Sequence, residues 1–450
     1  MTGLILDESQ ERAVDLVCTA KLGVVTGGPG TGKSTCLRVA LDRLDRAGVR
    51  YELASPTGKA ARRLSEATEG RNARTLHRLL EYNPGRGGFQ RNSGHPLECD
   101  IVIVDEASMV DLELFAALMR AVRSHRTRVI LVGDANQLPP VGPGRPFGDM
   151  VARKVLPTVR LEVLHRAAQT SWIHVAAQDL LRGRQPALEK RVDFVWMPVN
   201  DPVWILRKIK RLVTEVFVPG GPIDAEVQVL IPQHQGVAGI QAANAEMQSV
   251  LNPKRANEPV FPRNLWEIRK RDVVIQTRND YDLNVFNGEI GRTLEVGPLF
   301  ECTTDEHGER KPRLDKFGQP IPMLDSDGRQ CEGVRVQFAG HEELSTYVGG
   351  DVNALQLAYA LTVHRSQGSE FPWAIVVCHS CYNPILLSRQ LLYTAITRAK
   401  RGVVLVGDQK GLERAIKNAR PDHRNTTLVT RLDGLLERPE HGEPLLEETG

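Results

Sequence analysis

The chain has 450 residues, of which 41% are hydrophobic and 25% are charged, an ordinary composition for a globular protein of roughly two to four domains. Its 58 basic and 55 acidic residues nearly cancel, so the net charge of +3 neither requires nor excludes a nucleic-acid partner. No apolar run approaches the ~20 residues of a membrane span, no cationic leader is visible, and seven cysteines lack framework spacing, so we expect a cytoplasmic protein without a membrane segment.

Strand-like and helix-like runs alternate through residue 140, which predicts a parallel sheet covered by helices. The strand candidates are Leu22–Val25, Val49–Ala54, Ile101–Val104 and Val129–Val132, and helices are expected near 33–47, 58–68, 74–81 and 110–123. The stretch Tyr82–Glu98 interrupts this alternation with Gly, Asn and Pro, a composition that favours a hairpin or finger.

The first strand leads into a complete Gly-x4-Gly-Lys-Ser phosphate loop at 27–34. Glycines let successive backbone amides turn towards phosphates, while Lys33 supplies a charge and the Ser34 hydroxyl can ligate Mg²⁺. The helix that begins at Lys33 adds its positive end. A chance glycine-rich turn is the alternative, but a strand before and a helix after the loop favour a nucleoside-triphosphate site. The residues expected around the nucleotide are Gly28, Gly30, Thr31, Gly32, Lys33, Ser34 and Thr35.

Two carboxylates, Asp105 and Glu106, follow the β-branched run Ile101–Val104. Such a run is typical of a buried parallel strand, so the pair is expected at a sheet edge rather than in a solvated loop. There Asp105 would hold Mg²⁺ through water, and Glu106 would orient or deprotonate the attacking water.

Two further strand ends carry polar candidates. Gln137, within Gly133–Val141, can reach a γ-phosphate from the end of its strand, although a polar turn closed by two prolines is the alternative. Thr57, within Ser55–Ala61, can hold a nucleic-acid phosphate, although the segment also fits an ordinary strand-to-helix turn.

A second α/β pattern begins after about residue 150. Its strand candidates are Val227–Ile231, Val273–Gln276, Ala374–Val377 and Val403–Val406. Between the second and third candidates, region 286–350 has short alternating runs and predicts a small β-barrel-like insertion. The tail at 433–450 is acidic and is expected to be disordered.

Arginines in this half are candidates for stabilising a transferring phosphoryl group. Arg398 lies on a helix of good formers, and Arg166 is a second candidate; for an isolated arginine the alternative is a solvated helix face. The lone Cys378-x-x-Cys381 has no second pair at zinc spacing, which favours structural cysteines over a metal site.

In order and spacing these motifs resemble the RecD-like branch of the superfamily 1 helicases (superfamily 1B), which moves 5′→3′ on DNA. The resemblance covers roughly residues 4–432. Its motifs are Gly27–Thr35, Ser55–Ala61, Thr75–Leu80, Asp105–Met109, Gly133–Val141, Val363–Glu370 and Tyr393–Lys400.

The resemblance implies an α/β fold with two RecA-like parallel-sheet motor domains and two insertions, with ATP and Mg²⁺ as cofactors. The first motor domain is expected at 1–150 with a β-hairpin pin at 82–98. The second is expected at 151–285 and 351–432, with the SH3-like insertion at 286–350. The segment 298–329 is longer and more polar than a minimal SH3-like barrel needs. We expect the chain to be a motor core without the family's N-terminal extension.

The resemblance also implies roles for single residues. Gln10 resembles the adenine-reading glutamine, Gln137 the phosphate sensor, and Arg166 with Arg398 the two arginine fingers. Positions expected to contact DNA or couple it to ATP are Thr57, His77, Thr362, His364 and Gln367, with Phe89 of the pin stacking on the first base pair.

The function implied is that of an ATP-dependent helicase acting as a monomer on single-stranded DNA and DNA forks. Three alternatives stay open: a motor subunit of a multi-protein nuclease or recombination complex, an RNA-directed helicase, and an ATP-driven switch that binds nucleic acid without translocating. Besides DNA, a single-strand-binding protein or nuclease subunits are candidate partners.

Overall fold

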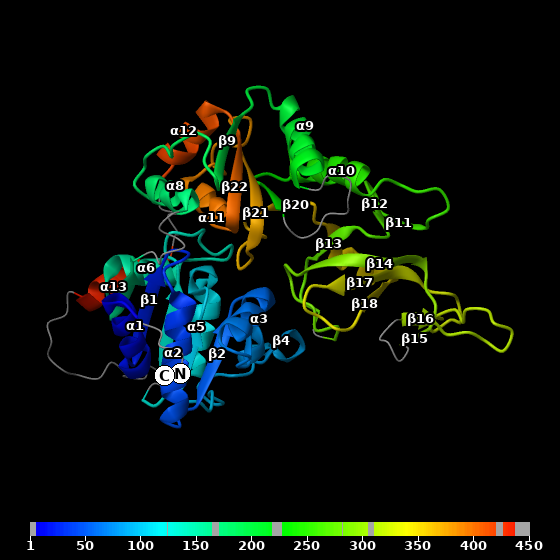
Figure 1. The fold of residues 1–450 in the computed structure, drawn as a ribbon. Coiled ribbons are helices and arrows are strands. Elements are labelled where there is room, and N and C mark those ends of the chain that lie inside the picture. Colours follow the sequence, from blue (N-terminus) through cyan, green and yellow to red (C-terminus); the bar gives the residue numbers. More distant parts are fainter. Residues whose placement is uncertain are drawn as a thin grey trace. The chain divides into compact units, whose positions relative to one another are not determined.

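The structure, a computed structural model, describes residues 6–123, 125–163, 171–217, 227–280, 282–304, 310–419 and 426–436. The described residues form two compact units (Figure 1). The first takes residues from 6–56, 60–163 and 426–436, and the second takes 57–59 and 171–419. No helix within these ranges is long and apolar enough to cross a membrane.

The first unit is built on a six-stranded sheet in the order β3-β2-β6-β7-β1-β8, and every neighbouring pair runs parallel. Its strands are β1 (Leu22–Gly27), β2 (Tyr51–Ser55), β3 (Ala73–Thr75), β6 (Ile101–Val104), β7 (Arg128–Gly133) and β8 (Thr158–Leu161). The predicted parallel sheet is therefore confirmed. Strand β8 lies beyond the limit of 150 expected for this domain, because its pairing with β1 completes the sheet.

Both faces of this sheet are buried. In β6, Ile101 and Ile103 join one core cluster with helices α1 and α2, while Val102 and Val104 join a second cluster with α5 and α6. Burial on both faces explains the continuous β-branched run. The helical segments of this part of the chain are α1 (Glu8–Thr19), α2 (Lys33–Arg46), α3 (Gly58–Ala67), α4 (Leu76–Leu79), η2 (Ala107–Met109), α5 (Leu112–Ala121), α6 (Pro146–Arg153) and α13 (Leu428–Leu436).

Helix α13 corrects the expectation of a disordered tail from 433. Residues 433–436 complete this helix, which contacts α6 through an Arg153–Asp433 ion pair of 3.3 Å. Residues 437–450 lie outside the described part of the chain.

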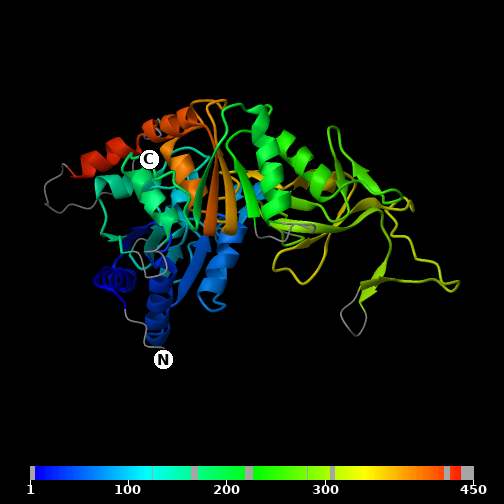
Figure 2. The ribbon, with the colours of Figure 1, turned by 45° about the horizontal axis from the view of Figure 1, so that its top comes forward.

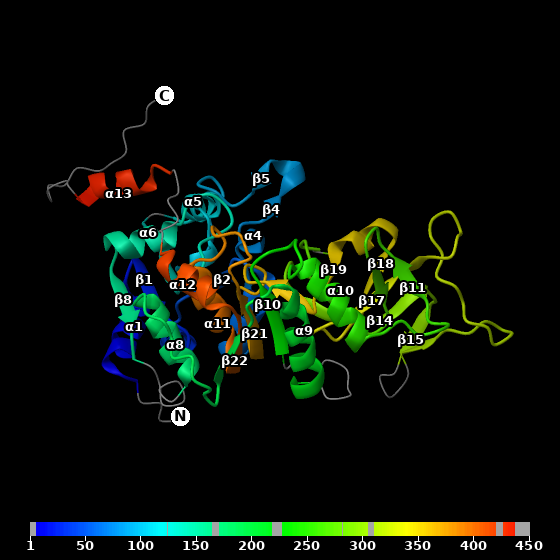
Figure 3. The ribbon, with the colours of Figure 1, turned by 90° about the horizontal axis from the view of Figure 1, so that it is seen from above.

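The interruption at 82–98 contains a hairpin, as predicted. Strands β4 (Tyr82–Asn83) and β5 (Gly88–Phe89) pair antiparallel around a short 3₁₀ turn, η1 (Pro84–Arg86), and the hairpin projects from the first unit (Figure 3). Gly87 and Gly88 both have positive φ (82° and 108°), a conformation that favours glycine and permits this tight turn.

The second unit contains a five-stranded parallel sheet in the order β20-β10-β21-β22-β9. Its strands are β9 (Phe194–Pro198), β10 (Val227–Ile231), β20 (Ala360–Thr362), β21 (Phe371–Cys378) and β22 (Ala399–Gly407). Helices α8, α11 and α12 lie to one side of it, and α9 and α10 lie to the other (Figure 1). The helical segments are α8 (Trp172–Leu181), α9 (Val203–Arg211), the π-helical η3 (Leu212–Phe217), α10 (Ile240–Leu251), α11 (Arg389–Ile396) and α12 (Gln409–Lys417).

The same unit holds a five-stranded antiparallel sheet in the order β18-β17-β14-β13-β19. Its elements are β13 (Val273–Gln276), β14 (Ile290–Pro298), β17 (Glu332–Phe338), β18 (Ser345–Val348), η4 (Gly349–Ala354) and β19 (Leu355–Leu357), beside the hairpin β11 (Val260–Pro262) and β12 (Glu267–Arg269). The predicted barrel-like insertion is thus a real sheet with its own core.

Placing β13 in the parallel sheet was wrong. Its run Val273-Val274-Ile275 is as apolar as a buried parallel strand, but both of its neighbours, β14 and β19, run antiparallel to it. The antiparallel sheet consequently begins before residue 286.

The described residues of the long segment 298–329, namely 298–304 and 310–329, form an arm between β14 and β17 (Figure 2). It carries the pair β15 (Cys302–Thr304) and β16 (Arg310–Pro312), and two turns in which Asp315 and Asp325 each accept two backbone amides. Arg335 of β17, 2% exposed, anchors the arm by donating to the carbonyl of Phe300 at 2.6 Å.

Candidate nucleotide site and nucleic-acid-contact residues

Three adjacent strands of the first sheet, β6, β7 and β1, end in the predicted nucleotide residues. Because the strands are parallel, their carboxyl ends meet at one edge, where ligands of open α/β sheets bind. The phosphate loop follows β1, the pair Asp105-Glu106 follows β6, and Gln137 follows β7 by four residues.

The phosphate loop turns through two glycines with positive φ, Gly30 at 76° and Gly32 at 84°. Lys33 begins α2, and its Nζ donates to the carbonyls of Gly27 at 2.6 Å and Gly28 at 2.9 Å. The ammonium group is therefore held across the loop itself. Ser34, next on the helix, is exposed and accessible to a ligand.

Gln10 lies against this loop. It is 2% exposed on α1, and its Nε2 donates to the carbonyl of Thr31 at 3.4 Å. Its Oε1 accepts the backbone amide of Asp7 at 3.2 Å, completing a capping box at the start of the helix. The helix cap thus fixes the position of the side chain expected to read adenine.

Asp105 directly follows β6, and its backbone amide donates to the carbonyl of Ala54 at 2.9 Å. Burial, and then the neighbouring Glu106 carboxylate, raise its pKa to about 6, while Lys33 and Arg63 act in the opposite direction. Glu106 itself has φ 51°, a left-handed conformation that is uncommon for a side chain of its size.

This pair of neighbouring carboxylates fits a divalent cation. Burial, and then the Glu106 carboxylate beside it, disfavour the charged form of Asp105 and raise its pKa, and a dication bound at this edge would stabilise the charged form. Carboxylate and hydroxyl oxygens, here Asp105 and Ser34, are the hard ligands that Mg²⁺ prefers.

Gln137 is 5% exposed, and its Oε1 is a buried acceptor without a hydrogen-bond partner among the described residues. Its Nε2 makes one long bond of 3.4 Å to Asp134 Oδ2. Buried polar atoms are nearly always satisfied, so an open acceptor at the site edge indicates a place for a ligand or a bound water.

Of the two predicted arginine fingers, only Arg398 lies among the described residues. Arg398 is 3% exposed, and its guanidinium donates to the carbonyls of Thr394 at 3.1 Å and Ser369 at 3.3 Å. In this structure it is thus held inside the second unit by neutral acceptors. Arg166 lies outside the described residues.

The nucleic-acid candidates of the first half follow β2 and β3, the two strands that continue the sheet on one side of β6. Thr57 follows β2, and His77 follows β3 on α4, whose first turn is capped by the Thr75 hydroxyl. Burial lowers the pKa of His77, so this imidazole is biased towards its neutral form.

The aromatic side chains of the hairpin form a cluster with His77. The rings of Tyr82 and Phe89 lie 4.9 Å apart, and those of His77 lie 5.4 Å from Tyr82 and 5.6 Å from Phe89. Phe89 also packs against the core, whereas Tyr82 is 42% exposed. Sequence reasoning missed Tyr82, although an aromatic residue two positions before Pro84-Gly85 was a visible signal.

The nucleic-acid candidates of the second half gather after β20. Thr362 ends this strand, its hydroxyl accepts the amide of Arg365 at 3.2 Å, and Gln367 is 7% exposed. Burial, and then the nearby His234, lower the pKa of His364. His234 follows β10, the strand beside β20, and was also missed; a histidine three residues after a buried strand was its only signal.

Three family models match the chain. They are an AAA domain at residues 5–196, an ATP-dependent RecD-like DNA helicase SH3 domain at 243–310, and a UvrD-like helicase C-terminal domain at 357–406. The second spans most of α10, β11–β14 and part of the arm.

Two solved structures with the same fold are one described as DNA unwinding at forked double-stranded DNA by two coordinating Pif1 helicases, and one of Pif1 helicase from Bacteroides in complex with ADP-AlF3 and single-stranded DNA. Their TM-scores are 0.53 and 0.52 at 18% identity, over 96% of this chain and 98% of each of theirs. At this identity they establish the helicase fold.

Relatives by sequence are closer. The chain is 36% identical to the ATP-dependent RecD2 DNA helicase of Deinococcus radiodurans, over 95% of this chain and 52% of that protein, so it spans about half of that relative's length. It is 30% identical to the RecBCD enzyme subunit RecD of Mycobacterium tuberculosis, over 91% of this chain and 70% of that subunit. With the motifs collected at one sheet edge and an SH3 domain of the RecD-like type, the chain belongs to the RecD-like family of DNA helicases.

Proposed function

We propose that this chain is an ATP-dependent DNA helicase that translocates 5′→3′ on single-stranded DNA and unwinds duplex DNA. The observation that carries the proposal is the common edge of β6, β7 and β1, where Lys33, Asp105, Glu106 and the open acceptor of Gln137 meet. The RecD2 relative, named as an ATP-dependent DNA helicase, supports the reaction.

In this proposal the motor comprises two RecA-like domains, one on each parallel sheet, with the hairpin at 82–98 as a pin and the antiparallel sheet as the SH3-like domain. ATP binds at the first sheet, with Gln10 at the adenine and residues 28–35 around the phosphates. Lys33 exchanges its bonds to the carbonyls of Gly27 and Gly28 for bonds to phosphate oxygens.

Bound Mg²⁺, held by Ser34 and Asp105, would neutralise charge on the phosphates. Glu106 accepts a proton from the attacking water, and Gln137 orients that water by accepting from it through Oε1 or senses the γ-phosphate by donating through Nε2. Arg166 and Arg398 stabilise the charge of the transferring phosphoryl group, so Arg398 must exchange its carbonyl partners for phosphate oxygens during turnover.

DNA is held through its backbone, which suits movement without sequence preference. Thr57, His77, Thr362, His364 and Gln367 are the proposed contacts, and in the hairpin Phe89 supports Tyr82, the more exposed ring. We propose that the chain works as a monomer in a reducing cytoplasm; all seven of its cysteines are free.

Unwinding of forked duplexes tests the proposal. The purified chain should displace a strand from a DNA fork with a 5′ tail, using ATP and Mg²⁺, and fail on a fork with only a 3′ tail. The Lys33→Ala variant, which loses the phosphate-binding ammonium, is the matched control and should be inactive on both. Equal activity on RNA forks, or activity only with a 3′ tail, would contradict the substrate or the direction.

A second candidate is a motor subunit that is silent outside a multi-protein nuclease or recombination complex. The 30% identity to the RecD subunit of a RecBCD enzyme supports this second candidate. Under this alternative the isolated chain hydrolyses ATP with DNA but displaces no strand, and unwinding appears only when nuclease subunits are added.

The hairpin offers a test of the pin. Replacing residues 85–95 with a short Gly-Ser turn should leave DNA-stimulated ATP hydrolysis and single-strand translocation intact and abolish strand displacement. Tyr82→Ala should lose more unwinding than Phe89→Leu, because Tyr82 exposes its ring and Leu still fills the packed position of Phe89. Unwinding at the parental rate without the hairpin would leave strand separation to another element.

A further inference from the structure

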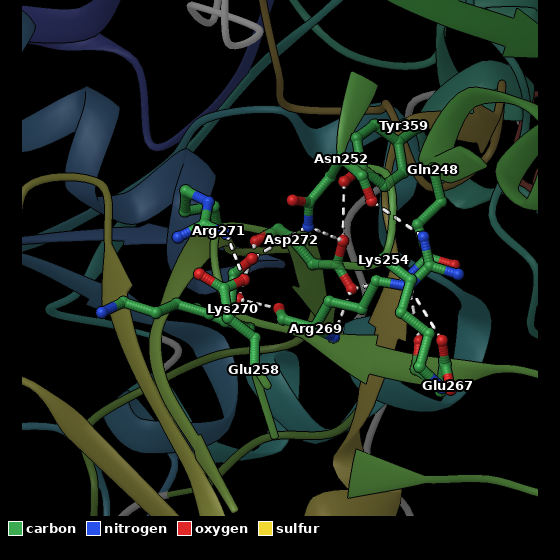
Figure 4. A network of polar contacts seen from close by, with 11 residues as sticks. Gln248, Asn252, Lys254, Glu258, Glu267, Arg269, Lys270, Arg271, Asp272 and Tyr359 are labelled. Atoms are coloured by element: carbon green, nitrogen blue, oxygen red, sulfur yellow. Dashed lines mark hydrogen bonds and ion pairs between the residues drawn. The ribbon is translucent and has the colours of Figure 1, made fainter. Parts of the chain in front are cut away.

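A fully buried carboxylate with no part in the nucleotide site lies in the second unit. Asp272, 0% exposed, directly precedes β13, and four donors surround it (Figure 4). Its Oδ1 accepts from Asn252 Nδ2 and from the Tyr359 hydroxyl, each at 2.7 Å. Its Oδ2 accepts from Gln248 Nε2 at 2.6 Å and from the Arg269 amide at 2.7 Å. Both oxygens are therefore satisfied.

The four donors come from three separate segments. Gln248 and Asn252 belong to α10 and its C-cap, which packs on the parallel sheet through contacts with β20. Arg269 ends β12, and Tyr359 lies in the two-residue connection between β19 and β20. Asp272 itself begins the antiparallel sheet. One carboxylate thus ties the antiparallel sheet to a helix and a strand connection of the parallel-sheet domain.

The connection that Tyr359 occupies is held by two further buried amides. Asn244 of α10 donates to the carbonyl of Ala360 at 3.1 Å and accepts its amide at 2.9 Å. Gln228 of β10 donates to the carbonyls of Ala358 and Tyr359, each at 3.2 Å. With the Tyr359–Asp272 bond, every residue of 358–360 is fixed by a buried side chain.

This connection links two sheets of different kinds. On one side β19 pairs antiparallel with β13, and on the other β20 pairs parallel with β10. Strand β20 ends at Thr362 and leads directly to His364 and Gln367, the proposed DNA and coupling residues. Only residues 358–361 separate β19 of the antiparallel sheet from Thr362. A displacement of the antiparallel sheet would therefore also move Thr362, provided that the buried hydrogen bonds of this connection stay intact.

The outer side of the network is weaker. Glu267 pairs with Arg269 at 2.9 Å and with Lys254 at 3.2 Å, and Arg271 pairs with Glu258. Lys254 is 58% exposed, and exposed pairs of this kind contribute little. The buried bonds to Asp272 consequently carry the joint, because a donor or acceptor left unpaired there has no water to replace its partner.

We propose that Asp272 is a positioning residue that locks the SH3-like antiparallel sheet to α10 and to the segment leading into β20, so that both move as one body during ATP turnover. This inference rests on the proposed function. Its consequence is tight coupling: each ATP hydrolysed shifts the DNA contacts after β20 together with the SH3-like sheet. If the sheet and the connection could move independently, ATP would still be hydrolysed, but fewer nucleotides would be translocated per ATP.

Tyr359→Phe tests the lock with the least damage to the fold, because it removes only the hydroxyl that bonds Asp272. Tyr347→Phe is the matched control: its buried hydroxyl bonds Gln276 Oε1 at 3.0 Å, entirely within the antiparallel sheet. Asp272→Asn should have the larger effect, because each oxygen of Asp272 accepts from two donors and the amide nitrogen that replaces one oxygen cannot accept from either. Each variant is measured for DNA-stimulated ATP hydrolysis, nucleotides translocated per ATP, and hydrogen exchange of single amides.

For Tyr359→Phe we expect hydrolysis within about two-fold of the parent and fewer nucleotides translocated per ATP. Exchange of the Ala358 and Ala360 amides, which bond Val273 and Asn244, should quicken about 5- to 150-fold, the range that one lost buried bond implies for local opening. Tyr347→Phe should change neither coupling nor these two amides. Asp272→Asn should lower the number of nucleotides translocated per ATP and speed the exchange of these two amides more than Tyr359→Phe does.

Unchanged exchange and unchanged coupling in Tyr359→Phe would overturn the lock, as would equal losses in Tyr359→Phe and Tyr347→Phe, which would indicate general loosening. If Asp272→Asn does not fold, Tyr359→Phe still decides. If the parent chain hydrolyses ATP without translocating, the proposed helicase function fails, while the exchange measurement continues to test the joint.

Discussion

Two aspartates of this chain show how differently a fold treats a desolvated carboxylate. Burial raises the pKa of both Asp105, at the edge of the first sheet, and Asp272, at the root of the antiparallel sheet. Asp272 is surrounded by four donors that satisfy both of its oxygens. Asp105 instead lies beside another carboxylate, with Lys33 and Arg63 as the cations that act on it.

The difference teaches how to separate structural from functional polar groups. A satisfied group stabilises the fold and needs nothing else, whereas an under-compensated one at a sheet edge is held ready for a ligand. Gln137 Oε1, a buried acceptor with no partner among the described residues, belongs with Asp105 in the second class.

Arginines extend this comparison and give the largest expected effect. Arg398→Ala should reduce the rate of ATP hydrolysis by about 10³- to 10⁵-fold, the range for arginine fingers, while nucleotide binding persists. Arg389 is the matched control, because its guanidinium also donates to a backbone carbonyl, that of Ile416 at 2.8 and 3.0 Å. Single-turnover hydrolysis and thermal unfolding are measured for both.

Arg389→Ala should lower thermal stability and leave hydrolysis near the parental rate. If Arg398→Ala behaves in the same way, its bonds to Thr394 and Ser369 are its whole role, and the guanidinium is structural.

The second effect concerns the carboxylate next to Asp105. Glu106→Gln keeps the shape of the side chain but cannot accept a proton, so turnover should fall about 10²- to 10⁴-fold while ATP still binds. Glu113→Gln, an exposed acid in the first turn of α5, is the control and should hydrolyse normally. Full turnover of the Glu106 variant would show that Glu106 is not the general base.

The first sheet was predictable because its signals are local. The phosphate loop, the run Ile101–Val104 and the acids after it each lie within a few residues, and burial on both faces requires the β-branched residues that reveal the strand. The site at that edge follows from the parallel order alone.

The second unit was less predictable because its pairings are long-range. Val273–Gln276 has the composition of a parallel strand, and only its neighbours β14 and β19 make it antiparallel. Strand β20 has three residues, too few for a periodic signal, and β9 carries Trp, Met and Pro. The Asp272 joint unites residues up to 111 positions apart in a chain with no repeat, from Gln248 to Tyr359, and no local pattern reveals it.

The two aspartates can be separated by stability. Asp272→Asn should reduce the free energy of unfolding by roughly 1–3 kcal/mol, because buried donors lose a charged acceptor. Asp105→Asn should leave stability unchanged or raise it, since a carboxylate beside Glu106 is removed, while Mg²⁺-dependent hydrolysis collapses. Urea unfolding and steady-state hydrolysis measure both; a stability loss in Asp105→Asn as large as in Asp272→Asn would end the distinction between the two sites.

The smallest expected effect is in the pH dependence of stability, and its sign follows from the direction of each pKa shift. Burial raises the pKa of Asp272 despite its hydrogen bonds, so the folded chain binds this proton more tightly than the unfolded chain, whose aspartates titrate near ~3.9. The stability contributed by Asp272 is then fully present below that pH and is lost as the pH rises through the folded pKa. The destabilisation caused by Asp272→Asn should consequently be largest near pH 4 and shrink towards pH 7.

Asp408 is the control of opposite sign. Although burial acts to raise its pKa, hydrogen bonds from the backbone amides of Ser380 and Gly411 lower its pKa overall. The loss of stability caused by Asp408→Asn should therefore grow as the pH rises from 3 to 5. Parallel pH profiles for the two variants would show that the donors around Asp272, rather than its burial, decide its ionisation.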